Sequence, residues 1–305
     1  FLGIEIGGTK LQLGLGHGDG HLAALWRGAV NAADGSEGIR RQIVGAVPEL
    51  LAKANLDRGH LRGVGIGFGG PTDDRSQTVI KSHQIEGWDG FPLADWVSDL
   101  VGVSAVLCND ADVAGLAEAL FGAGKGLSPI FYITVGTGVG GGLIIDGQIY
   151  RGVGRGAAEI GHYVIAEGPE GEDDLTVEKL ASGRAIERYA KRADLFADGA
   201  PATVRTVAAL ARDDNFRARH IFSTATDALA EAIAQMVTLL CPARVVIGGG
   251  VSLVGGDLFF TPIREKVALR TFPPFAGLTD IVPAALGEEV VVHGALALAR
   301  QRFGG

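Results

Sequence analysis

The spacing of apolar residues changes several times along the chain, and each change predicts an element. Residues 2–16 alternate between apolar and other positions around Gly7 and Gly8, which predicts two strands joined by a tight glycine turn. Helices are expected at residues 36–54, 93–100, 184–192, 204–211, 223–240 and about 290–302. Short apolar runs at residues 61–68, 105–108 and 245–247 predict buried strands.

A second glycine turn lies within residues 130–150. Gly136, Thr137 and Gly138 stand between two apolar runs, so this segment repeats the strand, glycine turn, strand plan of residues 2–16. It contains G-x-G-x-x-G, but a dinucleotide fingerprint should open a helix, whereas Leu143 continues into another strand. A single Gly-Gly turn is more typical of a plain hairpin. The repetition favours a pair of turns that hold phosphate through backbone N–H groups, joined in the first turn by Thr9 and Lys10.

Asn109 and Asp110 follow the short apolar run at residues 105–108, ahead of a helix predicted at 113–121 with Asp112 as its cap. In an open α/β sheet, ligands bind where strands end in this way. Asp110 is therefore either a carboxylate that faces a ligand or a second capping residue. The glycine turns elsewhere in the chain favour the first interpretation.

Composition narrows the classes of function. The 305 residues are 47% hydrophobic, which allows a large core, and the length favours about two domains. With 27 basic and 35 acidic residues the net charge is −8, and the absence of a dense Lys/Arg run argues against binding to nucleic acid or to an anionic membrane. No transmembrane run or signal peptide is recognisable, so we expect a reduced, cytoplasmic protein. Because the sequence opens directly on a strand, a few residues are expected to precede it.

Other candidate ligands stand in loops and at strand ends. They are Gly70 in a glycine loop, Glu159 and His162 in another, Glu178 on a helix that Thr176 would cap, and Gly248, Gly249 and Gly250 after an apolar run. A lone Glu or His on a loop is usually just solvated. Glycines at a strand end let a flat base approach the backbone closely. Trp88 is more typical of a packed aromatic residue than of a sugar platform.

Six motifs, in order and across nearly the whole chain, resemble the ROK family of sugar kinases and repressors. They are Gly7-Gly8-Thr9-Lys10, Asn109-Asp110, the glycine-rich run 134–142, Glu159-Ile160-Gly161-His162, Glu178 followed by residues 181–183, and Gly248-Gly249-Gly250. The resemblance implies the α/β, actin-like (ribonuclease H-like) ATPase fold, with two α/β domains around a central cleft. A small domain would comprise residues 1–112 and a C-terminal helix at about 288–303, and a large domain residues 113–287.

The resemblance also implies a role for each motif. Asp110 would be the catalytic base. The sugar would contact Gly70, Gln84, Asn109, Glu159, His162 and Glu178. ATP would be held by Gly7, Gly8, Thr9, Lys10, Gly136, Thr137, Gly138, Gly248, Gly249 and Gly250. Glu5 stands where the family commonly has an Asp near the magnesium ion, so a contact between Glu5 and Mg²⁺ through water is expected.

Two further departures from the family pattern bear on cofactors and substrate. The cysteine-rich zinc segment is absent, because no Cys lies between Cys108 and Cys241, so we expect no structural zinc and a metal-free replacement over residues 161–176. Gln84 stands where many relatives have Asn, and Gly69 where a Pro is frequent. Both changes touch the implied sugar site, so they leave the identity of the sugar open.

These observations predict an ATP- and Mg²⁺-dependent sugar kinase, with glucose and its 6-hydroxyl as the first choice. Fructose, N-acetylglucosamine and N-acetylmannosamine come next, and a polyphosphate-dependent glucokinase and a non-catalytic sugar-binding relative stay open. A polyphosphate donor would call for a basic groove, which the sequence does not indicate. A repressor of the family would carry an N-terminal helix-turn-helix, whereas this sequence opens on the phosphate hairpin. A homodimer is what the resemblance implies.

Overall fold

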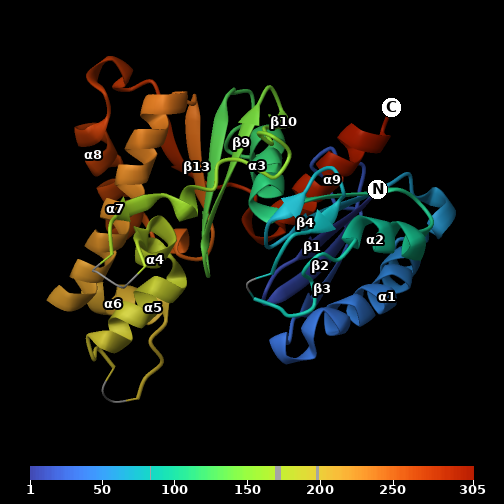
Figure 1. Cartoon of the computed structure of the whole chain (residues 1–305), viewed down its shortest axis with the longest axis horizontal. Coiled ribbons are helices and arrows are strands. Elements are labelled where there is room, and N and C mark those ends of the chain that lie inside the picture. The colour runs from blue at the N-terminus through green and yellow to red at the C-terminus, as the bar shows by residue number, and fades with distance from the viewer. Residues whose placement is uncertain (83, 169–172, 197–198) are drawn as a thin grey trace. The chain divides into compact units, whose positions relative to one another are not determined.

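The computed structural model describes residues 1–82, 84–168, 173–196 and 199–305 (Figure 1). Contacts between residues divide it into two units. Unit 1 comprises residues 1–126, 142–157 and 285–305, and unit 2 comprises residues 127–141 and 158–284. Unit 1 is larger than the domain expected from residues 1–112 and the last helix. It includes helix α3 (Asp110–Phe121), which packs against helix α9 (Val290–Phe303).

Unit 1 is built on a five-stranded mixed sheet with the order β3-β2-β1-β4-β7. Strands β1 and β2 are antiparallel and joined by the predicted glycine turn, β3 is antiparallel to β2, and β4 and β7 run parallel to β1. The elements are β1 (Leu2–Ile6), β2 (Lys10–Leu15), β3 (Ala24–Ala29), α1 (Gly35–Lys53), β4 (Val64–Phe68), α2 (Leu93–Val101) and β7 (Ala105–Asn109). A small hairpin, β5 (Thr72–Asp73) with β6 (Thr78–Val79), follows β4.

The two faces of this sheet are covered differently because the strand residues alternate. Apolar side chains such as Ile4, Leu13 and Ile66 are buried in one core cluster with residues of α1 and α2. The opposite face is rich in glycine, and α9 lies against it (Figure 1). A Cβ on Gly65 would lie 1.9 Å from the carbonyl oxygen of Ala295, so glycine is what allows this close approach.

The second sheet has the order β10-β9-β8-β13-β14, the same plan as the first: a glycine hairpin, a third strand on its outer side and two later strands on the other. Strands β13 and β14 are parallel to β8 and to each other. The strands are β8 (Ile130–Val135), β9 (Val139–Ile145), β10 (Gln148–Ile149), β13 (Arg244–Gly248) and β14 (Asp280–Pro283). The internal repeat inferred from the two glycine turns is confirmed by this shared strand order.

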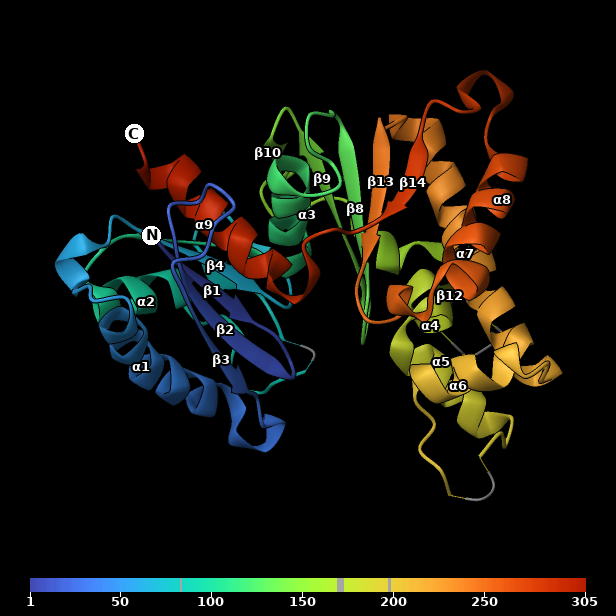
Figure 2. The ribbon, with the colours of Figure 1, turned by 180° about the vertical axis from the view of Figure 1, so that it is seen from behind.

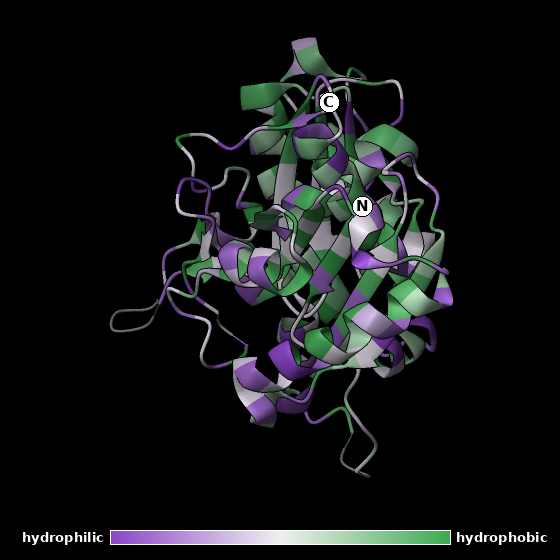
Figure 3. Ribbon diagram, turned by 90° about the vertical axis from the view of Figure 1, so that its right-hand side faces the viewer, coloured by the Kyte–Doolittle hydropathy of each residue, from purple (hydrophilic) through white to green (hydrophobic). Residues whose placement is uncertain are grey.

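The described residues of unit 2 also form five α-helices, of which α7 is the longest and contacts the other four. They are α4 (Val177–Ala181), α5 (Gly183–Arg192), α6 (Val204–Arg212), α7 (Phe216–Leu240) and α8 (Thr261–Arg270). Figure 2 shows β13 and β14 beside α7 and α8. In Figure 3 the helices are banded in purple and green, as expected for elements with one polar and one apolar side.

Several sequence predictions need correction. Asp112 does not cap the helix after β7. The helix begins at Asp110, and the Asn109 side chain accepts hydrogen bonds from the N–H groups of Ala111 and Asp112. The long helix starts at Phe216 rather than Ser223. Strand β4 starts at Val64 rather than at residue 61. Strands β3 and β14, helix α8 and the β5–β6 hairpin were not predicted.

Trp88 lies in the core, as the more ordinary interpretation expected. Its side chain is fully buried, and its ring meets Phe68 and Phe91 edge-on, with ring centroids 5.5 and 5.4 Å apart.

Among the described residues, none of the helices has the length and apolar character that a membrane crossing requires.

Candidate active site

The first glycine turn joins β1 to β2 and lies at the carboxyl end of β1. The Gly7 N–H donates to the Lys10 carbonyl oxygen (3.0 Å), which closes the turn, and the Thr9 side chain is exposed. Lys10 Nζ lies 2.9 Å from Glu5 Oε1 and donates to the Glu288 carbonyl oxygen at 3.0 Å. These two contacts use two of the three N–H groups of the ammonium, and the third is left for another acceptor.

Glu5 is a buried carboxylate behind this turn, with 4% of its surface exposed. Burial raises its pKa to about 7; the ammonium group of Lys10 opposes the shift, and the carboxylates of Asp110 and Glu288 add to it. Its second oxygen, Oε2, is buried and has no hydrogen-bond partner. An unpaired, buried carboxylate oxygen close to another carboxylate is a donor set that fits a magnesium ion or its water.

Asn109 and Asp110 lie beside the Gly69-Gly70 loop, at the carboxyl ends of the adjacent parallel strands β7 and β4. The Asn109 side-chain N–H donates to the Gly70 carbonyl oxygen at 3.1 Å, while its Oδ1 caps α3. A Cβ on Gly69 would lie 3.3 Å from Asp110 Oδ2 and 3.7 Å from the Cα of Gly7. The structure therefore brings together the predicted base, the glycine loop and the first glycine turn.

Gln84 lies against the first glycine turn. A Cβ on Gly8 would lie 1.7 Å from Gln84 Oε1, so the amide occupies the space above Gly8. The sequence assigned Gln84 to the sugar and Gly8 to the phosphates, and the structure shows that these two residues are direct neighbours. His83, immediately before Gln84, lies outside the described residues.

In unit 2, the second glycine turn is held by the chain around α4 and α5. Gly136 N–H donates to the Gly138 carbonyl oxygen (2.9 Å), and Gly183 N–H donates to the Gly136 carbonyl oxygen (2.8 Å). Thr137 is exposed at its tip, and a Cβ on Gly136 would meet nothing within 4 Å. The backbone of Gly136 and Thr137 thus borders open space, as a turn that receives phosphate requires.

The other predicted residues of unit 2 gather around Val139, the first residue of β9. Glu178 accepts a hydrogen bond from the Val139 N–H at 2.8 Å. A Cβ on Gly161 would lie 2.0 Å from the Val139 carbonyl oxygen, so the 160–162 turn is equally close. Glu159 and His162, on this turn, have exposed side chains. Thr176 caps α4 by accepting from the Lys179 N–H, as the sequence predicted.

Gly248, Gly249 and Gly250 follow β13 and pass beside the end of β8. Gly249 has a φ of +87°, and a Cβ there would lie 2.5 Å from the Val135 carbonyl oxygen. Val251 N–H donates to the same oxygen at 2.9 Å. Since Val135 precedes Gly136, the structure places this glycine loop next to the second glycine turn, and a Cβ on Gly250 would meet nothing within 4 Å.

Residues 161–176 are the stretch expected to replace the zinc segment, and the parts of it that the structure describes include a small two-stranded sheet. Strand β11 (Val164–Ala166) pairs antiparallel with β12 (Leu175–Thr176), and the middle of the stretch, residues 169–172, lies outside the described residues. The Gly168 N–H donates to Asp174 Oδ1 at 3.2 Å. Among the residues that the structure describes, no group of three or more His, Cys, Asp or Glu side chains could hold a metal ion.

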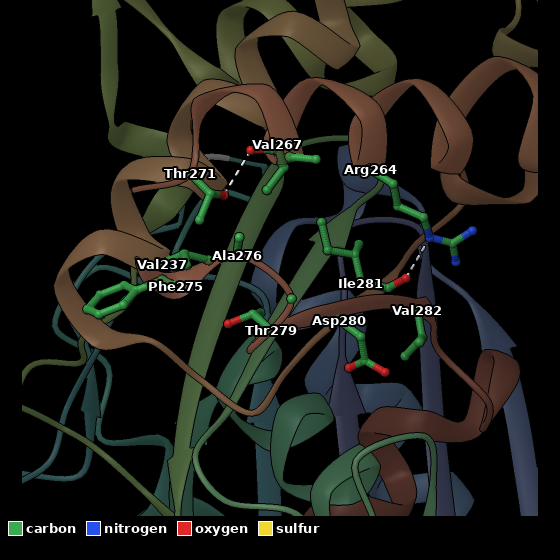
Figure 4. Close-up of a pocket in the computed structure, with 12 residues that line it drawn as sticks. Val237, Arg264, Val267, Thr271, Phe275, Ala276, Thr279, Asp280, Ile281 and Val282 are labelled. Atoms are coloured by element: carbon green, nitrogen blue, oxygen red, sulfur yellow. Dashed lines mark hydrogen bonds between the residues drawn. The ribbon is translucent and has the colours of Figure 1, made fainter. Parts of the chain in front are cut away.

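A cavity of about 470 Å³ lies elsewhere in unit 2, between α7, α8 and β14 (Figure 4). Its lining is mainly apolar, with Val267, Phe275 and Ile281 among the side chains and Asp280 at its edge. Asp280 pairs with Arg244 at the amino ends of β14 and β13, whereas Gly248 ends β13. The cavity is therefore at the end of the strands away from the glycine loop, and none of the predicted site residues lines it.

Three polar residues that are buried or partly buried escaped the sequence analysis. Gln12 is the cross-strand partner of Glu5, Glu118 binds three backbone N–H groups, and Arg151 bonds to residues of three other elements. Glu118 and Arg151 bind residues far along the chain, so the local pattern around them carries no signal.

Comparison with known proteins agrees with the fold. The ROK family model matches residues 1–302. A glucokinase from Thermotoga maritima is 31% identical over 317 residues, covering 100% of this chain and 98% of the relative. The chain belongs to the ROK family.

Two solved structures of ROK enzymes are similar to this chain over almost its whole length. A ROK hexokinase from Thermus thermophilus has a TM-score of 0.84 and 27% identity, covering 99% of this chain and 98% of that one. A ROK glucokinase from Streptomyces griseus, solved in complex with glucose and AMPPNP, has a TM-score of 0.80 and 32% identity, covering 98% of this chain and 99% of that one. The fold is the actin-like ATPase fold of the ROK sugar kinases, as the sequence predicted.

Proposed function

We propose that this ROK-family hexose kinase transfers the γ-phosphoryl group of ATP to the 6-hydroxyl of glucose, with Asp110 as the general base. The observation that carries the proposal is the placement of the Asp110 carboxylate over Gly69 and close to Gly7, at the ends of two parallel strands. A sugar hydroxyl is a weak nucleophile, and a carboxylate that accepts its proton contributes about 10² to 10⁴ in rate.

The sugar side of the site would be formed by side chains with hydrogen-bonding capacity left over. Asn109 donates one amide N–H to the Gly70 carbonyl oxygen, and its side-chain oxygen accepts from N–H groups at the α3 N-terminus. Its second N–H is therefore available to a sugar hydroxyl. Glu159 and His162 have exposed side chains, and Glu178 has a second carboxylate oxygen besides the one bonded to Val139. We assign these residues, with Gly70 and Gln84, to sugar binding.

The phosphate side would be formed by the two glycine turns, with the loop at 248–250 next to the adenosine. Phosphoryl transfer depends on positioning and charge neutralisation, and backbone N–H groups and the Lys10 ammonium supply both. Glu5 would hold Mg²⁺ directly or through water, and the ion would neutralise charge on the ATP phosphates. This assignment is supported by the buried, unpartnered Glu5 oxygen.

A screen of sugars against two phosphoryl donors tests this proposal. Glucose, mannose, fructose, N-acetylglucosamine, N-acetylmannosamine and N-acetylgalactosamine would each be offered with Mg-ATP or with polyphosphate. We expect the highest kcat/KM for glucose with ATP. Transfer to none of these sugars would contradict the proposal, and a preference for polyphosphate or for another sugar would replace its donor or its substrate.

We also propose that the chain forms a homodimer. Large apolar side chains are exposed at the end of α7, on the adjacent α8 and in the loop after it, with Leu239 82%, Leu269 87% and Leu278 58% exposed. An apolar surface of this kind marks a contact with another protein. Sedimentation equilibrium tests the proposal, and a monomer at micromolar concentration would contradict it.

A further inference from the structure

Arg151 is a partly buried residue of unit 1 that has no role in the proposed chemistry. Its side chain is 16% exposed and follows β10. Its Nε donates to Asp74 Oδ2 (2.9 Å), and Nη2 pairs with the other Asp74 oxygen. Its Nη1 donates to Asp112 Oδ2 (3.2 Å) and to the Cys108 sulfur. Most of its hydrogen-bonding capacity is therefore used within the protein.

These partners lie on two strips of chain that meet at the candidate active site. Thr72 and Asp74 belong to the β5–β6 hairpin, a few residues after Gly70, and Thr72 Oγ1 lies 3.4 Å from Arg151 Nη2. Cys108 and Asp112 flank Asn109 and Asp110 on β7 and α3. The guanidinium therefore joins the two strips next to the hydrogen bond from Asn109 to the Gly70 carbonyl oxygen.

We propose that Arg151 is a positioning residue for the sugar side of the site, which holds Asn109 and Asp110 in register with Gly69 and Gly70. The proposal rests on the proposed sugar kinase function. The same rigid, planar group binds the chain on both sides of the Asn109–Gly70 bond, through Asp112 and Asp74, and bidentate pairing with Asp74 fixes its orientation. A displacement of about 1 Å between reacting groups costs up to about 10² in rate.

The burial of the partners around Arg151 shows that its contacts are not those of a simple surface ion pair. Asp112 is 2% exposed, so its carboxylate depends on the guanidinium for charge compensation. The backbone strengthens the same junction, because Asp74 N–H donates to the Gly154 carbonyl oxygen at 3.1 Å. Arg155, by contrast, is 75% exposed and pairs with Asp73 at 3.4 Å. It is a matched control, since it belongs to the same loop and also pairs with the hairpin.

The test compares Arg151→Met, Arg151→Lys and the control Arg155→Met with the wild type. In Arg151→Met we expect a glucose KM raised and a kcat lowered by about tenfold or more, with the ATP KM changed less than about twofold. Arg151→Lys, which keeps the charge but loses the bidentate geometry, should fall between Met and wild type. Arg155→Met should match wild type. A folded Arg151→Met with the wild-type kcat and glucose KM would overturn the inference.

Two further measurements keep the inference separate from folding and from the proposed function. If Arg151→Met does not fold, Asp74→Asn removes the bidentate charge pair alone and should shift the glucose KM in the same direction; unchanged kinetics would overturn the inference. A wild type inactive on every sugar would instead defeat the proposed function. In that case hydrogen exchange at the Ala111 and Asp112 amides, which Asn109 caps, still measures the positioning. We expect faster exchange in the Arg151 or Asp74 variant than in Arg155→Met, and equal rates would overturn the inference.

Discussion

Glu5 carries a carboxylate that folding removes almost entirely from water. Its only charged hydrogen-bond partner among the described residues is Lys10, and its second oxygen has none. A carboxylic acid in this position holds its proton to a higher pH than in the unfolded chain, where its pKa is near 4.5.

The raised pKa of Glu5 predicts a loss of stability with increasing pH. The folded state binds the proton up to about pH 7 and the unfolded state only up to about 4.5, so the free energy of unfolding falls as pH rises through this window. A shift of this size, which already includes the opposing charge of Lys10, corresponds to a loss on the order of 3 kcal/mol. In Glu5→Gln the contribution is absent. Thermal unfolding of both proteins between pH 5 and pH 8 should show that wild type loses stability relative to Glu5→Gln as the pH rises. The same pH dependence of the unfolding temperature in both proteins would contradict the prediction.

Helix α9 shows how single residues determine the packing of an element. It lies on the glycine-rich face of the first sheet, and Gly65 allows its backbone to contact β4 directly. Gly65→Ala should push the helix away from the strand and cost about 1–3 kcal/mol. Gly45, within α1, has nothing within 4 Å of its Cβ position, so Gly45→Ala should stabilise by about 0.5–1 kcal/mol. Urea denaturation of both variants measures the change in the free energy of unfolding. Changes of the same sign in the two variants would contradict the prediction.

Helix α3 is tied to the chain that leads into α9 by one buried side chain, Glu118. One of its oxygens accepts from the N–H groups of Ala285 and Leu286, both at 2.9 Å, and the other from Ala123 N–H at 2.7 Å. Glu118→Ala leaves three backbone donors without this partner and should cost about 3–5 kcal/mol. Glu118→Gln keeps one oxygen and should cost less. Urea denaturation of both variants tests this, and we expect the lower unfolding midpoint for Glu118→Ala. An alanine variant as stable as wild type would contradict the stabilising role of Glu118.

Over the whole molecule, the sequence predicted the elements whose periodicity is long and regular, and the site motifs that consist of consecutive residues. Helices α1, α2, α5 and α6 and both glycine hairpins lie where expected. Strand β14 and the β5–β6 hairpin are too short to show a period, and α8 buries only Ile263 and Val267, so its apolar face is weak. The cap at Asp112 was wrong because Asn109 already binds the free N–H groups, while Arg151 pairs with Asp112. The structural roles of Arg151 and Glu118 could not be predicted, because their partners are distant in the sequence and are brought to them only by the fold.

Each of the two similar sheets carries a glycine turn at the end of its first strand. In the proposed function, unit 1 contributes the base, the lysine and the buried Glu5, and unit 2 contributes the second turn and Glu159, His162 and Glu178. We propose that the chemical step depends on Asp110.

The most direct test of this account is the kinetics of Asp110→Asn together with calorimetric binding of glucose. Asn keeps the size of the side chain but replaces one carboxylate oxygen by an NH2 group and cannot take a proton, so glucose affinity should change little while kcat falls by about 10² to 10⁴. Asp112→Asn, on the same helix turn but bonded to Arg151, is the comparison and should leave much more of kcat. An Asp110→Asn variant that turns over glucose near the wild-type rate would contradict the account.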